Sequence, residues 1–257
     1  NDRFYVDLGT TKNEEYFLME KEECYKKWCH YAFAYNPNGL VKMYLNGKKV
    51  KEFQSEKNLI LDNKINIVLV PSNFNGDMDL FKQKAQDVWN LMQTHEPFDP
   101  SIDILNILYV PKESGDYCDL NCSGIPRLLC CNINTALSIS SECTSAERQT
   151  IVIHNDDSYG GGGFIGDDVA TTTIHPSSPK IAIHELGHSL FKLGDEYVAS
   201  DSDPSGFPNC DYSSCTKWSS MIGYKGVDCS PNSCGRGEYY ASETTIMRLL
   251  DYKFEEV

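Results

Sequence analysis

The stretch IAIHELGHSLFKLGDEY, residues 181–197, carries His184 and His188 four positions apart, with Glu185 directly after the first. Apolar residues precede and separate the histidines, and a glycine follows the run. This pattern predicts a helix from about Ser178 to Leu193. Side chains four positions apart lie on one face of a helix, where both imidazoles can reach a single metal ion. The stretch is therefore predicted to form one wall of a metal site.

Neighbouring residues supply the other groups that a hydrolytic metal centre needs. Glu185 can lean over the open position of the metal, take a proton from water and pass it to a leaving amine. A third protein ligand is expected soon after the helix. Gly194 is predicted to end the helix with a positive φ, so that a following carboxylate turns back toward the metal. Asp195 and Glu196 are the candidates, and Zn²⁺ is the ion that such a ligand set favours.

A chance match is the alternative to a metal site, because H-E-x-x-H strings also occur in helices that bind nothing. Three features of this sequence argue against chance. The motif lies on a predicted helix, the chain has only six histidines, and two carboxylates follow the helix closely. This combination favours a metal site that hydrolyses amide bonds.

The chain before this helix alternates apolar strands with a long amphipathic helix. The predicted order is strand, helix, strand, strand, strand and then the histidine-bearing helix, which indicates an α+β fold with that helix packed on a sheet. The predicted strands are INIVLVP (65–71), DILNILYVP (103–111), TIVIHN (150–155) and DVATTTI (168–174), and the long helix spans 77–95. A cysteine-rich segment from 111 to 149 interrupts them.

The first 62 residues have a different pattern. Aromatic and polar residues alternate there, and Asn46-Gly47 is typical of a tight turn between short strands. We expect a small β-rich domain over residues 1–62 and a second domain over residues 63–257. Beyond Gly194 the sequence is rich in Ser, Gly, Pro and Cys, which is typical of a compact cap held by disulfides.

Composition excludes some classes of function and favours others. The formal net charge of −14 disfavours nucleic acid as a partner, because binding to phosphates requires clustered cations. No stretch has the roughly 20 apolar residues of a transmembrane segment. Eleven cysteines without a CxxC pair indicate disulfides, an oxidising compartment and thus a secreted protein. The odd number leaves one cysteine over, and the spacings do not define the pairing.

The motif HELGHSLFKLGDEY resembles the active-site signature of the metzincin-like IgA-metallopeptidase family. Three further segments resemble the same family in the same order: YGGGGFIGDDVATTTIHP (159–176), KWSSMIG (217–223) and EYYASETTIMR (238–248). The resemblance covers about residues 63–257. It implies a secreted zinc endopeptidase with an upper subdomain (63–193), a lower subdomain (194–257) and a methionine-bearing turn beneath the metal.

The resemblance also implies roles for particular residues. His184 and His188 would be metal ligands, Glu185 the general base and acid, and Asp195 the third ligand, with Glu196 as its rival. Two positions depart from the metzincin pattern. Gly194 stands where the third ligand usually lies, and Phe191 stands where the pattern has glycine. Met247 is the expected residue of the methionine turn, and Met221 is the alternative. Tyr197 is expected to cap the turn, although its hydroxyl group is also suited to stabilising an oxyanion.

Other motifs carry weaker signals. The glycines at 160–163 suit either an edge strand that pairs with an extended peptide or a flexible loop, and they do not form a P-loop. His154 and His175 are expected to be ordinary hydrogen-bonded residues rather than ligands. The acidic pairs Asp156-Asp157 and Asp167-Asp168, and Asp201 with Asp203, are expected to be solvated rather than to bind Ca²⁺.

Three functions fit these features. The leading one is a secreted zinc endopeptidase that acts on protein or peptide substrates. The second is an extracellular binding or adhesion protein that retains a structural zinc site. The third is a zinc amidase that acts on a non-protein amide. Glu185 favours the enzymes, because a structural metal site has no need of a general base.

Overall fold

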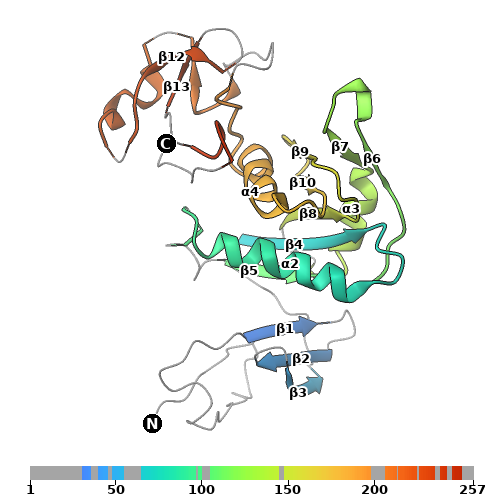
Figure 1. Cartoon of the computed structure of the whole chain (residues 1–257). Coiled ribbons are helices and arrows are strands. Elements are labelled where there is room, and N and C mark those ends of the chain that lie inside the picture. The colour runs from blue at the N-terminus through green and yellow to red at the C-terminus, as the bar shows by residue number, and fades with distance from the viewer. Residues whose placement is uncertain are drawn as a thin grey trace, which may run out of the picture.

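The computed structural model of the protein is shown in Figure 1. It describes residues 31–35, 40–45, 48–54, 65–96, 98–99, 105–144, 148–197, 206–212, 214–224, 226–234, 238–241 and 245–250.

An antiparallel three-stranded sheet forms the first described part of the chain. It consists of β1 (Tyr31–Tyr35), β2 (Leu40–Leu45) and β3 (Lys48–Gln54) in the order β1-β2-β3. The predicted Asn46-Gly47 turn lies outside the described residues, but Leu45 on one side of it pairs with Lys48 on the other. The predicted domain boundary at residue 62 also lies outside the described residues.

A five-stranded mixed sheet organises the central part of the protein. Its order is β5-β4-β8-β10-β9, in which β9 at the edge is antiparallel to β10 and the other neighbours are parallel. The strands are β4 (Ile65–Ser72), β5 (Leu105–Tyr109), β8 (Arg148–His154), β9 (Gly161–Phe164) and β10 (Val169–Thr172). The mixed sheet and its helices confirm the predicted α+β class. The glycine run predicted as either strand or loop is an edge strand.

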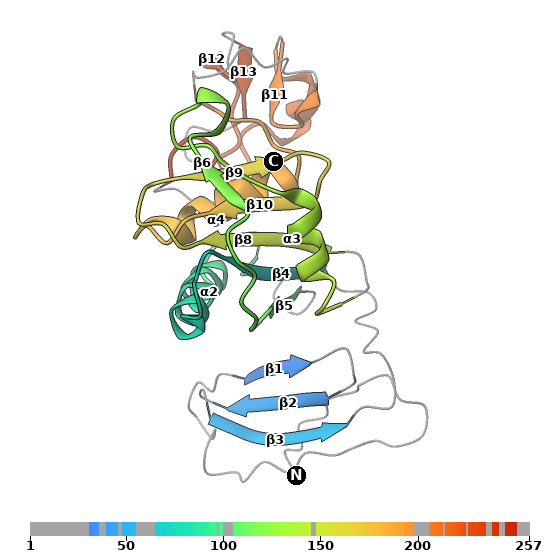
Figure 2. The same cartoon turned by 90° about the vertical axis from the view of Figure 1, so that its right-hand side faces the viewer.

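Helices cover both faces of this sheet, because alternate residues of each buried strand point to opposite sides. Ile67 and Leu69 pack with the cluster formed by α2 (Met78–Met92) and α4 (Ser178–Ser189), whereas Val68 and Val70 pack toward α3 (Ile133–Ser140). Figure 2 shows α2 and α4 together on one side of the sheet and α3 on the other. The histidine-bearing helix α4 is thus packed on the sheet, as predicted.

Helix α2 follows the predicted periodicity. The side chain of Asp77 accepts a hydrogen bond from Leu80 N and caps the first turn. Four apolar residues at helical spacing are buried against the sheet and α4: Phe81, Ala85, Val88 and Met92. This packing fixes α4 between α2 and the edge of the sheet.

The cysteine-rich segment holds structure that the sequence pattern did not predict. It forms a two-stranded antiparallel sheet of β6 (Cys118–Leu120) and β7 (Leu129–Cys131), a short 3₁₀ turn (Cys122–Gly124) and α3. Disulfides Cys118–Cys131 and Cys122–Cys130 close it. Cys143 is a free, half-buried thiol. Each strand has only three residues, too few to show a periodic signal.

The last described part of the chain is a small disulfide-linked unit. It contains β11 (Cys210–Asp211), a 3₁₀ segment (Thr216–Met221), β12 (Ser230–Ser233) and β13 (Glu238–Tyr240), in the sheet order β11-β13-β12. Disulfides Cys210–Cys234 and Cys215–Cys229 hold it, as expected for a stapled cap. Among the helices that the structure describes, none has the length and apolar character to cross a membrane.

Candidate metal centre

Helix α4 carries the two histidines on one face, and the chain then turns back beneath them. The helix ends at Ser189 rather than at the predicted Leu193. Lys192 has a φ of 59°, so the reversal occurs there and not through a positive φ at Gly194. Glycine is needed at 194 for space, because a Cβ would lie 2.8 Å from the Phe207 ring and 3.1 Å from Cys210 Sγ. The predicted turn is therefore present, but its residue was wrong.

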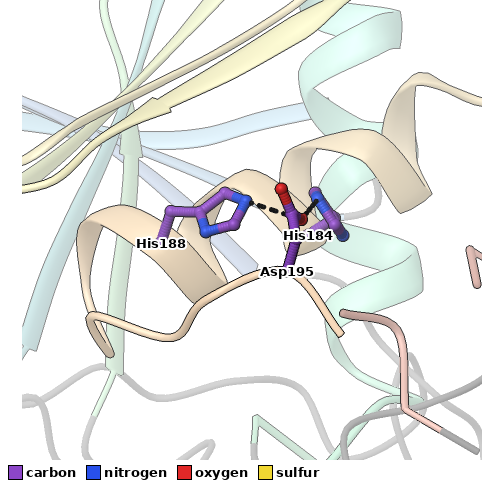
Figure 3. Close-up of side chains that lie close together, drawn as sticks. All are labelled: His184, His188 and Asp195. Atoms are coloured by element: carbon purple, nitrogen blue, oxygen red, sulfur yellow. Dashed lines mark ion pairs between the residues drawn. The ribbon is translucent and has the colours of Figure 1, made fainter. Parts of the chain in front are cut away.

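Three side chains converge where the turn meets the helix. Asp195 Oδ1 lies 3.2 Å from Nε2 of His184 and 3.2 Å from Nε2 of His188. The three side chains point toward one another in Figure 3. Among the described residues, they form a group whose candidate ligand atoms all lie within 4.8 Å of one another. Two ligands on a tetrahedral zinc ion lie about 3.3–3.4 Å apart when the bonds are about 2.0–2.1 Å long, so these spacings suit such an ion.

The hydrogen bonds of the two histidines determine which ring nitrogens are open. Nδ1 of His184 lies 2.9 Å from Ile246 O, and Nδ1 of His188 lies 2.7 Å from Leu193 O. A carbonyl oxygen only accepts, so both Nδ1 atoms carry the proton, and a neutral ring then directs a lone pair from Nε2. Oδ1 of Asp195 is buried without a hydrogen-bond donor from other side chains. Three electron-pair donors therefore face one point, which fits a cation.

The electrostatics of the cluster favour positive charge. Burial raises the pKa of Asp195, but the close contacts with the rings of His184 and His188 outweigh burial and hold that pKa well below its ordinary value. Burial lowers the pKa of His188, whereas the close contact with Asp195 and the charges of Glu185 and Asp195 raise it to about 9. The cluster thus attracts a proton when it is metal-free, and a divalent cation competes for the same lone pairs.

Glu185 is a residue of α4, and its side chain lies against the glycine strand β9. Burial raises the pKa of Glu185, more than the nearby histidines lower it. A Cβ at Gly161 would lie 3.0 Å from Glu185 Oε1, and a Cβ at Gly163 would lie 2.6 Å from the Glu185 carbonyl oxygen and 2.6 Å from His188 Cβ. Glycines at these two positions therefore let the strand lie directly on the helix that bears the histidines.

A cleft of about 580 Å³ opens over the cluster. Glycines 161–163 of β9 form one wall, and the loop 125–128 between β6 and β7 forms part of the rim. Several large apolar side chains in the cleft are exposed: Ile125, Tyr159, Ile165, Tyr197 and Leu249. An exposed apolar lining of this kind is typical of a binding cleft.

Comparison with known proteins identifies the family. The sequence profile of the IgA peptidase M64 family, a family of metallopeptidases, matches residues 62–209, more than half of the chain. The chain belongs to this family. No match to the chain is found among curated proteins. Membership makes this M64 protein a peptidase, hence a hydrolase that acts on peptide bonds, and implies a metal cofactor.

In this M64 peptidase, Glu196 does not face the cluster. It is fully buried, with Oε1 3.0 Å from Asn209 Nδ2 and Oε2 hydrogen-bonded to the Thr245 hydroxyl. Burial raises its pKa to about 7. Asn209 also accepts from Gly194 N and donates to Gly194 O, each at 2.8 Å. Asn209 thus fixes both the peptide before Asp195 and the carboxylate after it, a role that the sequence did not reveal.

The two methionines considered for the turn occupy different places. Met247 is buried in the main core with α4 residues, and its carbonyl oxygen accepts from Glu196 N. Its neighbour Ile246 supplies the carbonyl that orients His184. Met221 packs instead in a separate small cluster around Trp218. The structure therefore places Met247, and not Met221, in the turn next to His184.

The remaining predicted residues lie around or away from the cluster. Tyr197 lines the cleft, and its ring stacks on His184 with 6.5 Å between centroids. His154 bonds Ser72 Oγ through Nδ1, and His175 Nδ1 accepts from Ser177 N, so neither joins the cluster. Asp156 accepts a hydrogen bond from Ser158 N, and Asp168 accepts one from Gln149 Nε2. Asp201 and Asp203 lie outside the described residues.

Proposed function

We propose that the protein is a secreted, zinc-dependent endopeptidase with His184, His188 and Asp195 as zinc ligands. The observation that carries this proposal is the convergence of the two Nε2 atoms on Asp195 Oδ1, each at 3.2 Å, while that oxygen has no hydrogen-bond partner among the described residues. Two histidines and one carboxylate would occupy three positions of a tetrahedral zinc ion and leave the fourth for water or substrate, as in catalytic zinc sites. Asp195 is preferred to Glu196 because Glu196 is held by Asn209 and Thr245.

Each residue then has a defined task. A zinc ion, when bound, supplies Lewis-acid activation of water and of the scissile carbonyl. Glu185 takes the proton of the attacking water and delivers it to the amide nitrogen as the bond breaks. Ile246 and Leu193 hold the imidazoles in the orientation that directs Nε2 at the metal.

An extended peptide fits the open edge of β9. Gly161 N donates to Arg127 O at 3.1 Å, so this peptide group points away from β10. Alternate residues of a strand point the same way, which directs the N–H and C=O of Gly163 into the cleft. A substrate strand can pair with these groups by main-chain hydrogen bonds. This favours a peptidase over a zinc amidase. The half-buried Glu185 favours both enzymes over a binding protein, because a structural metal site has no need of a general base.

The protein's location and division into domains are also proposed. Four disulfides among the described residues favour an oxidising, extracellular compartment. We assign residues 1–62 to a small β-rich domain and residues 63–257 to a metzincin-like catalytic domain whose lower subdomain begins at 194. The family match that begins at residue 62 supports this boundary.

Cleavage of an unbiased peptide library by the zinc-loaded protein and by Glu185→Gln tests the proposal. We expect the parent to cleave internal bonds, and Glu185→Gln to retain one zinc per chain while kcat/KM falls about 10²- to 10⁴-fold. Glu142→Gln, which removes a carboxylate paired with Lys112 at the surface, is the matched control and should cleave normally. Full activity in Glu185→Gln would refute the assigned base, and a zinc-loaded parent that cleaves no peptide would refute the peptidase.

A further inference from the structure

The loop between β6 and β7 is held rigidly at the rim of the cleft. The disulfide Cys122–Cys130 closes it, and Asn121 Oδ1 accepts from Arg127 N at 2.7 Å. Its other side is joined to the sheet, because Arg127 O accepts from Gly161 N and Leu128 forms a parallel bridge with Gly161. The backbone of Arg127 is thus fixed from both sides, although its side chain is exposed.

Arg127 lines the same cleft as Glu185 and the candidate metal ligands. Its guanidinium stacks over the ring of Tyr159 at 5.4 Å from the centroid, and both residues line the cleft. Tyr159 in turn lies within electrostatic range of both Arg127 and Glu185. Stacking on an aromatic face leaves the N–H groups at the edge of the guanidinium plane for a ligand.

Among the residues that the structure describes, the charge of Arg127 has no ion-pair partner, although the chain is strongly acidic, with a net charge of −14. The other arginine of the cleft differs, because Arg248 donates to Glu196 O and stacks on Tyr240. The carboxylates that line the cleft are Glu185 and Asp195 of the catalytic cluster. Of the two arginines in the described lining of the cleft, Arg127 is therefore the one that is offered to a substrate.

We infer that Arg127 binds a carboxylate of the peptide substrate and so sets the specificity of cleavage. This inference rests on the proposed peptidase function. The strand geometry places that carboxylate near the end of the bound peptide, because Leu128 already occupies the edge of β9 at Gly161 and a substrate strand pairs at Gly163. A planar guanidinium matches a carboxylate with two parallel hydrogen bonds. The carboxylate belongs either to an acidic side chain or to the C-terminus of the peptide.

Matched peptides separate these two sources. One set carries Glu, Gln or Lys at each position flanking the cleaved bond, and a second set ends in a free carboxylate or an amide. In one of the two sets, we expect kcat/KM to be about tenfold higher for the peptide with the carboxylate than for its neutral counterpart, mainly because KM is lower. Arg127→Gln should reduce that ratio to near one. Gln tolerates the positive φ of 70° no worse than Arg does, so the loop should keep its fold.

A charge-matched control and a binding assay make the test decisive. Lys84→Gln removes one positive charge from α2, outside the cleft, and should leave the ratio unchanged. Fluorescence anisotropy with zinc-loaded Glu185→Gln measures peptide affinity without turnover and should show the same tenfold preference, lost when Arg127→Gln is added. Cleavage without any acidic preference, or a preference that survives Arg127→Gln, would overturn the inference and leave the peptidase intact. Absence of cleavage by the parent would instead refute the peptidase, while the binding preference would still report on Arg127.

Discussion

Nδ1 of His184 lies 2.9 Å from the carbonyl oxygen of Ile246, a residue 62 positions further along the chain. The hydrogen bond fixes the tautomer of the ring, so that Nε2 faces Asp195. The segment that contains Met247 thereby orients the imidazole of His184. Leu193, in the turn that follows α4, orients the imidazole of His188. The geometry of the candidate ligand cluster thus depends both on the turn that directly follows the helix and on a segment much further along the chain.

Asparagine at 195 should weaken metal binding more than glutamine at 196. Asp195→Asn removes the anionic oxygen that faces both histidines and should lower zinc affinity by at least about 100-fold. Glu196→Gln should retain one zinc per chain but lower the free energy of unfolding by about 1–3 kcal/mol, because the buried bonds with Asn209 and Thr245 are disturbed. Zinc titration against a competing chelator measures the first effect, and chemical denaturation the second. Loss of zinc only in Glu196→Gln would reverse the ligand assignment.

Alanine at 163 should disrupt the contact between β9 and the helix. The added Cβ would lie 2.6 Å from the Glu185 carbonyl oxygen and from His188 Cβ, so the strand or the helix must shift. We expect Gly163→Ala to lower the free energy of unfolding by about 1–3 kcal/mol and to reduce peptide cleavage. Gly206→Ala is the matched control, because nothing lies within 4 Å of its added Cβ, and it should be neutral within about 0.5 kcal/mol. Equal stability of the two variants would contradict the close approach.

The buried His154 should make stability depend on pH. Burial lowers its pKa below the ordinary 6.5, and the charges of Asp116 and Asp156 only partly oppose this shift. The unfolded chain therefore binds the proton more readily than the folded protein, so the stability that neutral His154 contributes is full above about pH 6.5 and is lost as the pH falls through the folded pKa. Denaturation of the parent and of His154→Gln at matched zinc concentrations measures this difference. The free energy of unfolding should fall less steeply with decreasing pH in the variant, and identical slopes would exclude the linkage.

Local periodicity predicted much of the fold. The strands that became β4, β5, β8 and β10 and the helices α2 and α4 each carry a pattern that their own residues define. The three-residue strands β6 and β7 do not, because their pairing is closed by cysteines whose partners cannot be deduced from spacing. The short strands β11, β12 and β13 were missed for the same reason.

The candidate site was predictable to the extent that it lies on one helix. His184, Glu185 and His188 follow from helical spacing, and their roles stay predictions. The end of the helix was misplaced because contacts across space decide it. Position 194 requires glycine because a side chain there would collide with Phe207 and Cys210. The side chain of Asn209 also hydrogen-bonds the N–H and the C=O of Gly194. The roles of Asn209 and Arg127 also depend on contacts between distant segments, which a single sequence does not display.

The glycine strand β9 has a consequence for how such a peptidase can diversify. Side chains at 161 and 163 would collide with α4, and one at 162 would lie 3.0 Å from Leu129 O and 3.2 Å from Leu128 Cδ1. These three positions have no room for a side chain on either face of the strand, so they present only peptide groups, which do not distinguish one substrate from another. The exposed rim residues Ile125, Pro126 and Arg127 carry no such restriction. New substrate preferences should arise by changes in this loop, while the strand beside it stays fixed.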